Sequence, residues 1–143
     1  MEAAEISRSG LDVEWTRLRV VAENIANINS SGPANGKGYV ARQLVSGPVE
    51  DFPATLDRMM REPMPARGVT VYGIEARRDG SKRVYAPNDP QADKQGFITE
   101  PNVSLATEMT EMLKAGRAYQ ANLVALSSAQ DMYASALKIG GRA

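Results

Sequence analysis

The side chains that most often carry out chemistry in proteins are missing from this chain. It has no cysteine and no histidine among its 143 residues. This excludes thiolate nucleophiles, disulfides and cysteine-ligated metals, together with the commonest general base and the commonest metal ligand. Carboxylates remain, so a hydrolase that uses a pair such as Glu75 and Asp93 is the enzymatic alternative. No catalytic constellation accompanies that pair in the sequence.

Two loops resemble ligand-binding motifs but lack their spacing. Gly32 stands three residues before the Gly36–Lys37 pair, whereas a phosphate-binding loop has four residues there. Asn88, Asp89 and Asp93 lack the alternating oxygen ligands and the closing Glu of a calcium loop. We therefore expect no catalytic residue, no cofactor and no bound metal.

Two polar clusters each allow a structural and a functional interpretation. Asn24, Asn27 and Asn29 either fray the end of a helix, or bond neighbouring helices through their amides and fix a register. The four basic residues between Arg77 and Arg83 surround an Asp-Gly turn. They either grip an acidic partner or remain solvated at the tip of a hairpin.

Apolar residues at both ends of the chain recur at alternating spacings of three and four. This spacing places them on one stripe of a helix, suited to knobs-into-holes contact with another helix. It predicts a first helix from about Ser9 or Leu11 to Asn29, and a second, capped by Ser104, that runs to Ile139. A second stripe of mostly small residues widens the apolar arc of the later helix, which favours more than one helical neighbour.

We predict that the two stripes, with two of the asparagines, form an assembly interface. From the first helix, the candidate residues are Leu11, Trp15, Leu18, Ala22, Asn24, Ile25 and Asn27. From the second helix, they are Leu105, Met109, Met112, Tyr119, Leu123, Leu126, Tyr133 and Leu137.

The middle of the chain has a different character, since all eight prolines lie between Pro33 and Pro101. A β-branched run predicts a strand over 69–76, and the following Asp-Gly turn predicts a hairpin whose return strand is 82–86. Further strands are expected over 39–46 and 96–99. The proline-rich segment 48–67 is predicted to be flexible, with a possible short helix over 54–61.

These elements predict an α+β fold in which long N- and C-terminal helices pair as a coiled-coil-like bundle around a small β-rich central insertion. The expected organisation is an N-terminal helix of the assembly core (1–32), a β-rich centre (33–101) and a long C-terminal helix of the same core (102–143).

Charge and hydropathy exclude other classes of function. Seventeen basic and seventeen acidic residues cancel, so no net field recruits nucleic acid or an anionic membrane. No stretch reaches the roughly 18 consecutive apolar residues of a membrane span. The first ten residues are polar and acidic, unlike a cleavable secretory signal. The sequence by itself suggests a cytoplasmic protein, unless an export route reads an uncleaved terminus.

Residues 22–30, Ala-Glu-Asn-Ile-Ala-Asn-Ile-Asn-Ser, resemble the Ser-Asn-Ile-Ala-Asn signature of the bacterial flagellar axial proteins, the rod, hook and hook-associated family. Segments 39–43, 84–93, 96–98, 101–103, 117–122 and 137–140 are similar to a proximal-rod member of that family. The resemblance covers nearly the whole chain. Glu23 departs from it, because the family usually has Ser at that place.

The resemblance implies a non-enzymatic structural subunit of the flagellar basal-body rod, polymerising through its terminal helices into a periplasm-spanning drive shaft. It implies export through the flagellar type III apparatus without a cleaved signal peptide. The implied partners are copies of the chain, other rod proteins and that apparatus, with no nucleic acid and no direct membrane insertion. Another flagellar axial or secretion-apparatus component is the alternative within the same class.

Overall fold

The computed structural model describes residues 2–35, 38–49 and 67–140. Two long helices, α1 (Glu2–Ala26) and α3 (Leu105–Gly140), enclose the central strands in sequence. The strands are β1 (Gly32–Pro33), β2 (Arg42–Pro48), β3 (Val69–Ala76), β4 (Ser81–Tyr85) and β5 (Phe97–Pro101). The predicted α+β class is confirmed, with two long terminal helices and a small β-rich centre.

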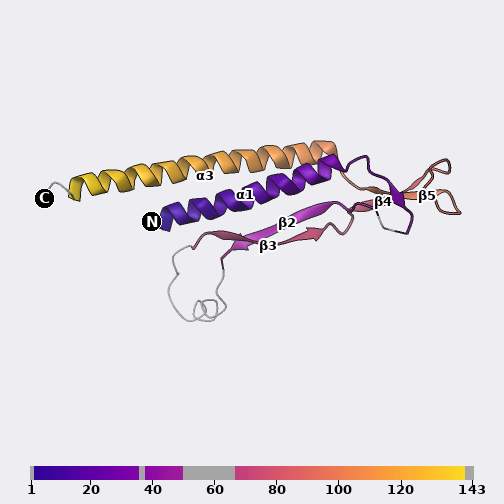
Figure 1. The fold of residues 1–143 in the computed structure, drawn as a ribbon, viewed down its shortest axis with the longest axis horizontal. Helices are drawn as coiled ribbons and strands as arrows, with labels where there is room; N and C mark the ends of the chain where they lie inside the picture. Colours follow the sequence, from indigo (N-terminus) through magenta and orange to yellow (C-terminus); the bar gives the residue numbers. More distant parts are fainter. Residues whose placement is uncertain (1, 36–37, 50–66, 141–143) are drawn as a thin grey trace, which may run out of the picture.

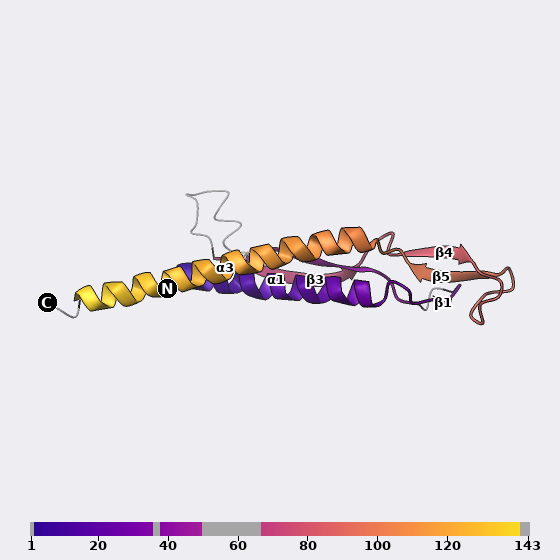
Figure 2. The ribbon, with the colours of Figure 1, turned by 90° about the horizontal axis from the view of Figure 1, so that it is seen from above.

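The molecule is long and narrow (Figure 1). α1 lies between α3 on one side and the β2–β3 ribbon on the other, and it contacts all three. The three-stranded sheet, in the order β1-β5-β4, lies beyond the end of the helix pair, as both views show (Figure 2). The terminal helices therefore pair within one chain, side by side and antiparallel.

The helix boundaries differ from the prediction at α1. It begins at Glu2 rather than near Ser9, because its first turns pack against α3: Ser7 and Gly10 are buried there. It ends at Ala26 instead of Asn29, where the chain turns and Ser30 N donates to Asn27 O at 3.0 Å. The expected α3 is confirmed, with Ser104 O accepting from Glu108 N at 3.0 Å in its first turn.

The predicted hairpin between strands 69–76 and 82–86 is wrong. β3 pairs with β2, and β4 pairs with β5, both antiparallel. The expected turn does form, since Gly80 N donates to Arg77 O. However, Gly80 O accepts from both Ala41 N and Asn102 N, so the chain is held there by other segments and passes from one sheet to the other.

Two other strand predictions need their limits moved. The strand expected over 39–46 begins at Arg42 and runs to Pro48, with an irregularity between Val45 and Ser46. The strand expected over 96–99 runs from Phe97 to Pro101. Of the segment predicted to be flexible, residues 50–66, including the proposed helix over 54–61, lie outside the described residues.

Neither helix in the described part of the chain combines the length and apolar character needed to cross a membrane. The same residues hold no cluster of three or more acidic side chains able to bind a metal ion.

Candidate assembly surface

Several small side chains lie buried in the seam where α1 packs against α3. On α1, Ser7 and Gly10 are buried, and on α3, Ala115 is almost fully buried. A Cβ added at Gly10 would lie 2.7–2.8 Å from the side-chain amide of Asn122, which is closer than Cβ atoms pack. Small residues thus let the two helices approach closely.

The predicted stripe of α1 is only partly covered in the single chain. Trp15 is 63% exposed and Ala22 is also exposed, while Leu11, Leu18 and Ile25 are half-buried. The buried apolar residues of α1 are instead its valines at 13, 20 and 21. The exposed residues of this stripe, Trp15 and Ala22, form an open flank of α1 in the single chain.

The stripe of α3 is divided between seam and solvent. Met112, Tyr119 and Leu126 are half-buried. The remaining candidate residues of this stripe are exposed, at 48% to 59%: Leu105, Met109, Leu123, Tyr133 and Leu137. Some residues of the α3 stripe are therefore partly covered in the single chain, whereas the others form an exposed apolar surface.

The open flanks of the two helices meet in a hollow of about 370 Å³, which we call the α1–α3 groove. It is lined by Arg8, Leu11, Asp12, Trp15 and Tyr119. Tyr119 is its lining residue from α3, and Arg8 and Asp12 give an otherwise apolar and aromatic lining two charged side chains.

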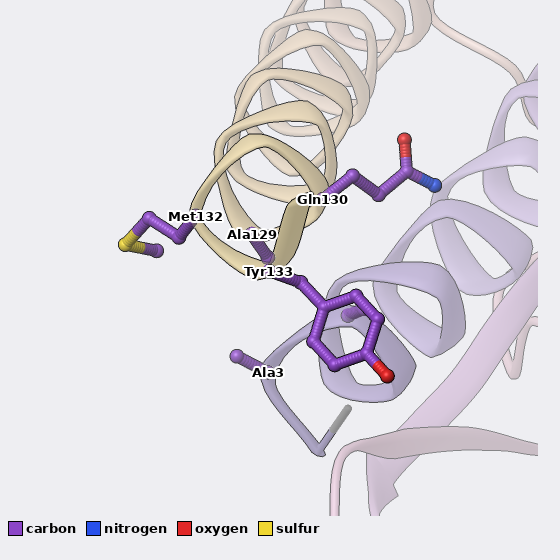
Figure 3. A pocket seen from close by; sticks show the side chains of 6 residues that line it. Ala3, Ala129, Gln130, Met132 and Tyr133 are labelled. Atoms are coloured by element: carbon purple, nitrogen blue, oxygen red, sulfur yellow. The ribbon is translucent and has the colours of Figure 1, made fainter. Parts of the chain in front are cut away.

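A second hollow, of about 330 Å³, lies where α1 begins (Figure 3). Its lining is mostly apolar and consists of Ala3, Ala4, Ala129, Gln130, Met132 and Tyr133. The ring of Tyr133 points towards the first turn of α1, whereas Met132 points away from it (Figure 3). From this point α3 continues without α1 beside it (Figure 1).

Asn24 joins three parts of the chain, as the second of its two sequence interpretations required. Its side chain is fully buried. Nδ2 donates to Arg42 O at 2.9 Å and to Glu108 Oε2 at 3.1 Å. Oδ1 accepts from Arg42 N at 2.9 Å and from the Tyr39 hydroxyl at 2.8 Å. Asn27 only bonds back to Glu23 O, within its own helix.

The Asn24 amide also explains where β2 begins. By bonding both the N–H and the C=O of Arg42, it serves as a strand partner for that residue. Burial raises the pKa of the Tyr39 hydroxyl above its ordinary value, which keeps the phenol protonated and able to donate.

Glu108 is a buried charge that the sequence pattern did not reveal. Its side chain is 0% exposed, and Oε1 lies 2.6 Å from Arg77 Nη2. Arg77 comes at the end of β3, so this ion pair ties the central strands to α3. Arg77 is therefore neither a solvated turn residue nor, in this structure, free to hold an acidic partner. The sequence offered no signal for this role, because an acidic residue in the first turn of a helix is ordinary.

The two carboxylates of the enzymatic alternative belong to different parts of the fold. Glu75 is exposed on β3. Asp93, in the β4–β5 loop, accepts N–H bonds from Gln95 and Phe97 and pairs with Arg83 at 3.1 Å. These bonds, that to Phe97 first, lower the pKa of Asp93 below its ordinary value. Through these bonds the carboxylate of Asp93 stabilises the conformation of the β4–β5 loop.

Known proteins are similar to this chain along nearly its whole length. Residues 94–139 match the family model described as flagellar basal body rod FlgEFG protein C-terminal. A protein of Agrobacterium fabrum named flagellar basal-body rod protein FlgC is 35% identical over 137 residues, covering 96% of this chain and 92% of that protein. Proteins of the same name from Borreliella burgdorferi and Bacillus subtilis are each 31% identical over 141 residues, covering 94% of this chain and 93% and 94% of theirs.

Proposed function

The chain belongs to the family of flagellar basal-body rod proteins named FlgC, and from that premise we propose that it polymerises through its terminal helices into the periplasm-spanning shaft of the rod. It is a structural protein of the bacterial flagellum that serves motility. Its partners in this proposal are copies of itself and other rod proteins, after delivery by the flagellar type III export apparatus without a cleaved signal peptide.

One observation supports polymerisation more than any other: several large apolar side chains of both helices remain exposed in the single chain. Trp15, Met109 and Leu123 are at least half exposed, while the small residues Ser7 and Gly10 of α1 are buried. Burying a side chain of this size gains about 1.5–3 kcal/mol. Because these side chains are only about half exposed, a neighbouring subunit that covers them would gain roughly half of that for each residue.

The same observation supports the division into segments. We propose that 1–32 and 102–143 form the assembly core and that 33–101 is carried outside it. Both open flanks belong to the helices. The three-stranded sheet lies beyond the helix pair, so it leaves the flanks uncovered (Figure 2).

Leu123→Asp tests this proposal with little effect on the chain itself, because Leu123 is half exposed in the single molecule. We expect normal synthesis and export but no incorporation into basal bodies and no motility. Leu126→Asp should also block assembly, although Leu126 is half-buried and its loss weakens the single chain as well. Ser128→Asp, exposed and about 140° around the helix from Leu123, is the matched control and should remain motile. Wild-type motility of the Leu123→Asp strain would refute the interface assignment.

A further inference from the structure

The contacts between α1 and α3 repeat in steps of seven residues. Three facing pairs show the register of the two antiparallel helices: Ala3 and Ala129, which share a hollow (Figure 3), Gly10 and Asn122, where an added Cβ would collide, and Asn24 and Glu108, which are hydrogen-bonded. Each step of seven or fourteen residues along α1 is matched by the same step back along α3. Seven residues make nearly two turns, so these positions share one face of each helix.

A register shifted by one heptad, that is by seven residues, would bring the same two faces together. The shift moves α3 about 10.5 Å towards the three-stranded sheet. The facing pairs would then be Ala3 with Ala136, Gly10 with Ala129, and Asn24 with Ala115. In the observed register α1 lies beside residues 106–130 of α3, and after the shift it would lie beside 113–137, still within that helix. The seam would keep its full length.

Apolar burial by itself favours the shifted register. The shift would cover Tyr133 and Leu137, which continue the seam face of α3 and are 52% and 59% exposed. In return it would uncover Met112, which is half-buried. The seam would also exchange the carboxylate of Glu108 for Ala136, which removes the cost of desolvating a charge. Something other than apolar packing must therefore hold the observed register.

Glu108 is the point at which α3 is fixed to the rest of the fold. Its Oε2 accepts from Asn24 Nδ2 at 3.1 Å, and its Oε1 lies 2.6 Å from Arg77 Nη2. We call these three residues the junction. Otherwise α3 packs along α1 and, within the described ranges, against no strand. Residues 102–104 join it to β5. A sliding α3 would therefore have no packing against a strand to break.

We propose that the junction is a register lock: it holds α3 at the heptad that leaves residues 131–140 uncovered, and without it α3 shifts by one heptad along α1. A polar group in a helical seam specifies register because only one alignment gives it partners. Glu108 has its partners in the observed alignment and would lie beyond the end of α1 in the shifted one. Asn24 would keep its bonds to Arg42 and Tyr39, which do not involve α3.

The lock determines which surface the single chain exposes. In the observed register every residue of 131–140 is exposed. In the shifted register the chain would cover most of this segment with its own α1. The inference concerns the fold of one molecule, so it goes beyond the proposed function and does not depend on it.

Because the chain has no cysteine, introduced pairs can report the register within one molecule. Ala3→Cys with Ala129→Cys reports the observed register, and Ala3→Cys with Ala136→Cys reports the shifted one. Ala129 and Ala136 are about 10.5 Å apart along α3, whereas a disulfide joins Cα atoms 4.4–6.8 Å apart. One register can therefore close only one of the two pairs. Ala3→Cys with Ser135→Cys is the matched control, since Ser135 is about 100° around the helix from Ala136 and away from α1.

The experiment oxidises the purified full-length chain at low concentration, and a non-reducing gel separates bonds within one chain from dimers. With the junction intact, we expect the 3–129 pair to close and the 3–136 pair to give at least tenfold less product. In the Arg77→Met, Glu108→Met background, the yield of the 3–136 pair should rise at least fivefold. Adding Tyr133→Glu and Leu137→Glu should lower it again, because covering these positions no longer favours the shift. The Ser135 control should stay open throughout.

Circular dichroism first establishes that each variant is folded. If the double Met background is unfolded, Glu108→Gln takes its place, because it removes the charge but keeps the shape of the side chain, and it should raise the 3–136 yield at least twofold. A folded junction variant that closes only the 3–129 pair would overturn the inference, since the apolar seam would then set the register. Equal closure of both pairs with the junction intact would overturn it as well. Both results would leave the proposed function standing, because incorporation into basal bodies tests that separately.

Discussion

Arg77→Ala removes the only cation that the structure places within ion-pair distance of the Glu108 side chain among the described residues. The carboxylate that remains is fully buried, between α1, α3 and the end of β3. Its sole other polar contact in that part of the chain is the Asn24 amide, 3.1 Å from Oε2. The substitution therefore leaves a buried charge with one neutral hydrogen bond.

Removing one partner of a buried ion pair costs about 3–5 kcal/mol, because the other charge stays desolvated. Arg77 itself is 23% exposed, so water can enter the space it vacates, and Asn24 continues to donate. We therefore expect the low end of that range, about 3 kcal/mol. Folded domains have about 5–15 kcal/mol in total, so the loss is a large fraction of the stability.

Urea unfolding followed by circular dichroism measures this effect. With a slope of about 1.5 kcal/mol per molar urea, the midpoint should fall by about 2 M. Arg78→Ala is the matched control, since Arg78 is the adjacent residue and exposed, and its effect should stay within about 0.5 kcal/mol. Replacing Arg77 and Glu108 together by Met should recover most of the loss. Equal midpoints for Arg77→Ala and Arg78→Ala would refute the account of the buried pair.

Three further predictions concern single positions. Gly116→Ala should raise the unfolding free energy by about 1 kcal/mol, because the added Cβ meets nothing within 4 Å and Ala is the better helix former; urea midpoints check this. Gly68→Ala should destabilise the chain by at least about 1 kcal/mol, since Gly68 has φ +92° and its Cβ would collide with Ser9 Oγ; an unchanged thermal midpoint would contradict it. The lowered pKa of Asp93 means that its carboxylate stabilises the β4–β5 loop at neutral pH and loses this effect as the pH falls below 3.8 and through the lowered pKa. Asp93→Asn should therefore speed hydrogen exchange of the Gln95 and Phe97 amides at pH 7 and remove most of the acid dependence seen in the wild type.

The helices could be predicted from the sequence because one local pattern carries them. The alternating spacing of apolar residues sets the extent of α3 almost to the residue. The pairing of strands could not be predicted in this way. The β-branched run at 69–76 and the Asp-Gly turn favour a local hairpin. In the structure, however, the Gly80 carbonyl accepts hydrogen bonds from Ala41 N and Asn102 N. These donors are distant in sequence, so a local pattern cannot reveal them.

The polar connection inside the fold was half visible in the sequence. Asn24 could be singled out because it weakens a helix that its neighbours favour. Its partner Glu108 carries no such signal, since a Glu in the first turn of a helix is ordinary and favourable there. Arg77 likewise resembles its exposed neighbour Arg78. Only the packing of α1 against α3 and β3 buries Asn24 and Glu108 together and gives the buried carboxylate Arg77 as its ion-pair partner.

The distribution of side-chain sizes argues that this chain does not complete its own core. A monomeric helix pair places its largest apolar residues in the seam, where each buried CH₂ gains about 0.8 kcal/mol. Here Gly10 and Ala115 occupy the seam, while Trp15 and Met109 remain more than half exposed. Gly10 and Ala115 allow a close approach of the helices, and large apolar side chains beside them stay exposed. If the single chain had to be stable alone, we would expect its large apolar residues in the seam and polar residues on the flanks. The observed arrangement therefore favours a molecule that contacts with neighbouring subunits stabilise further.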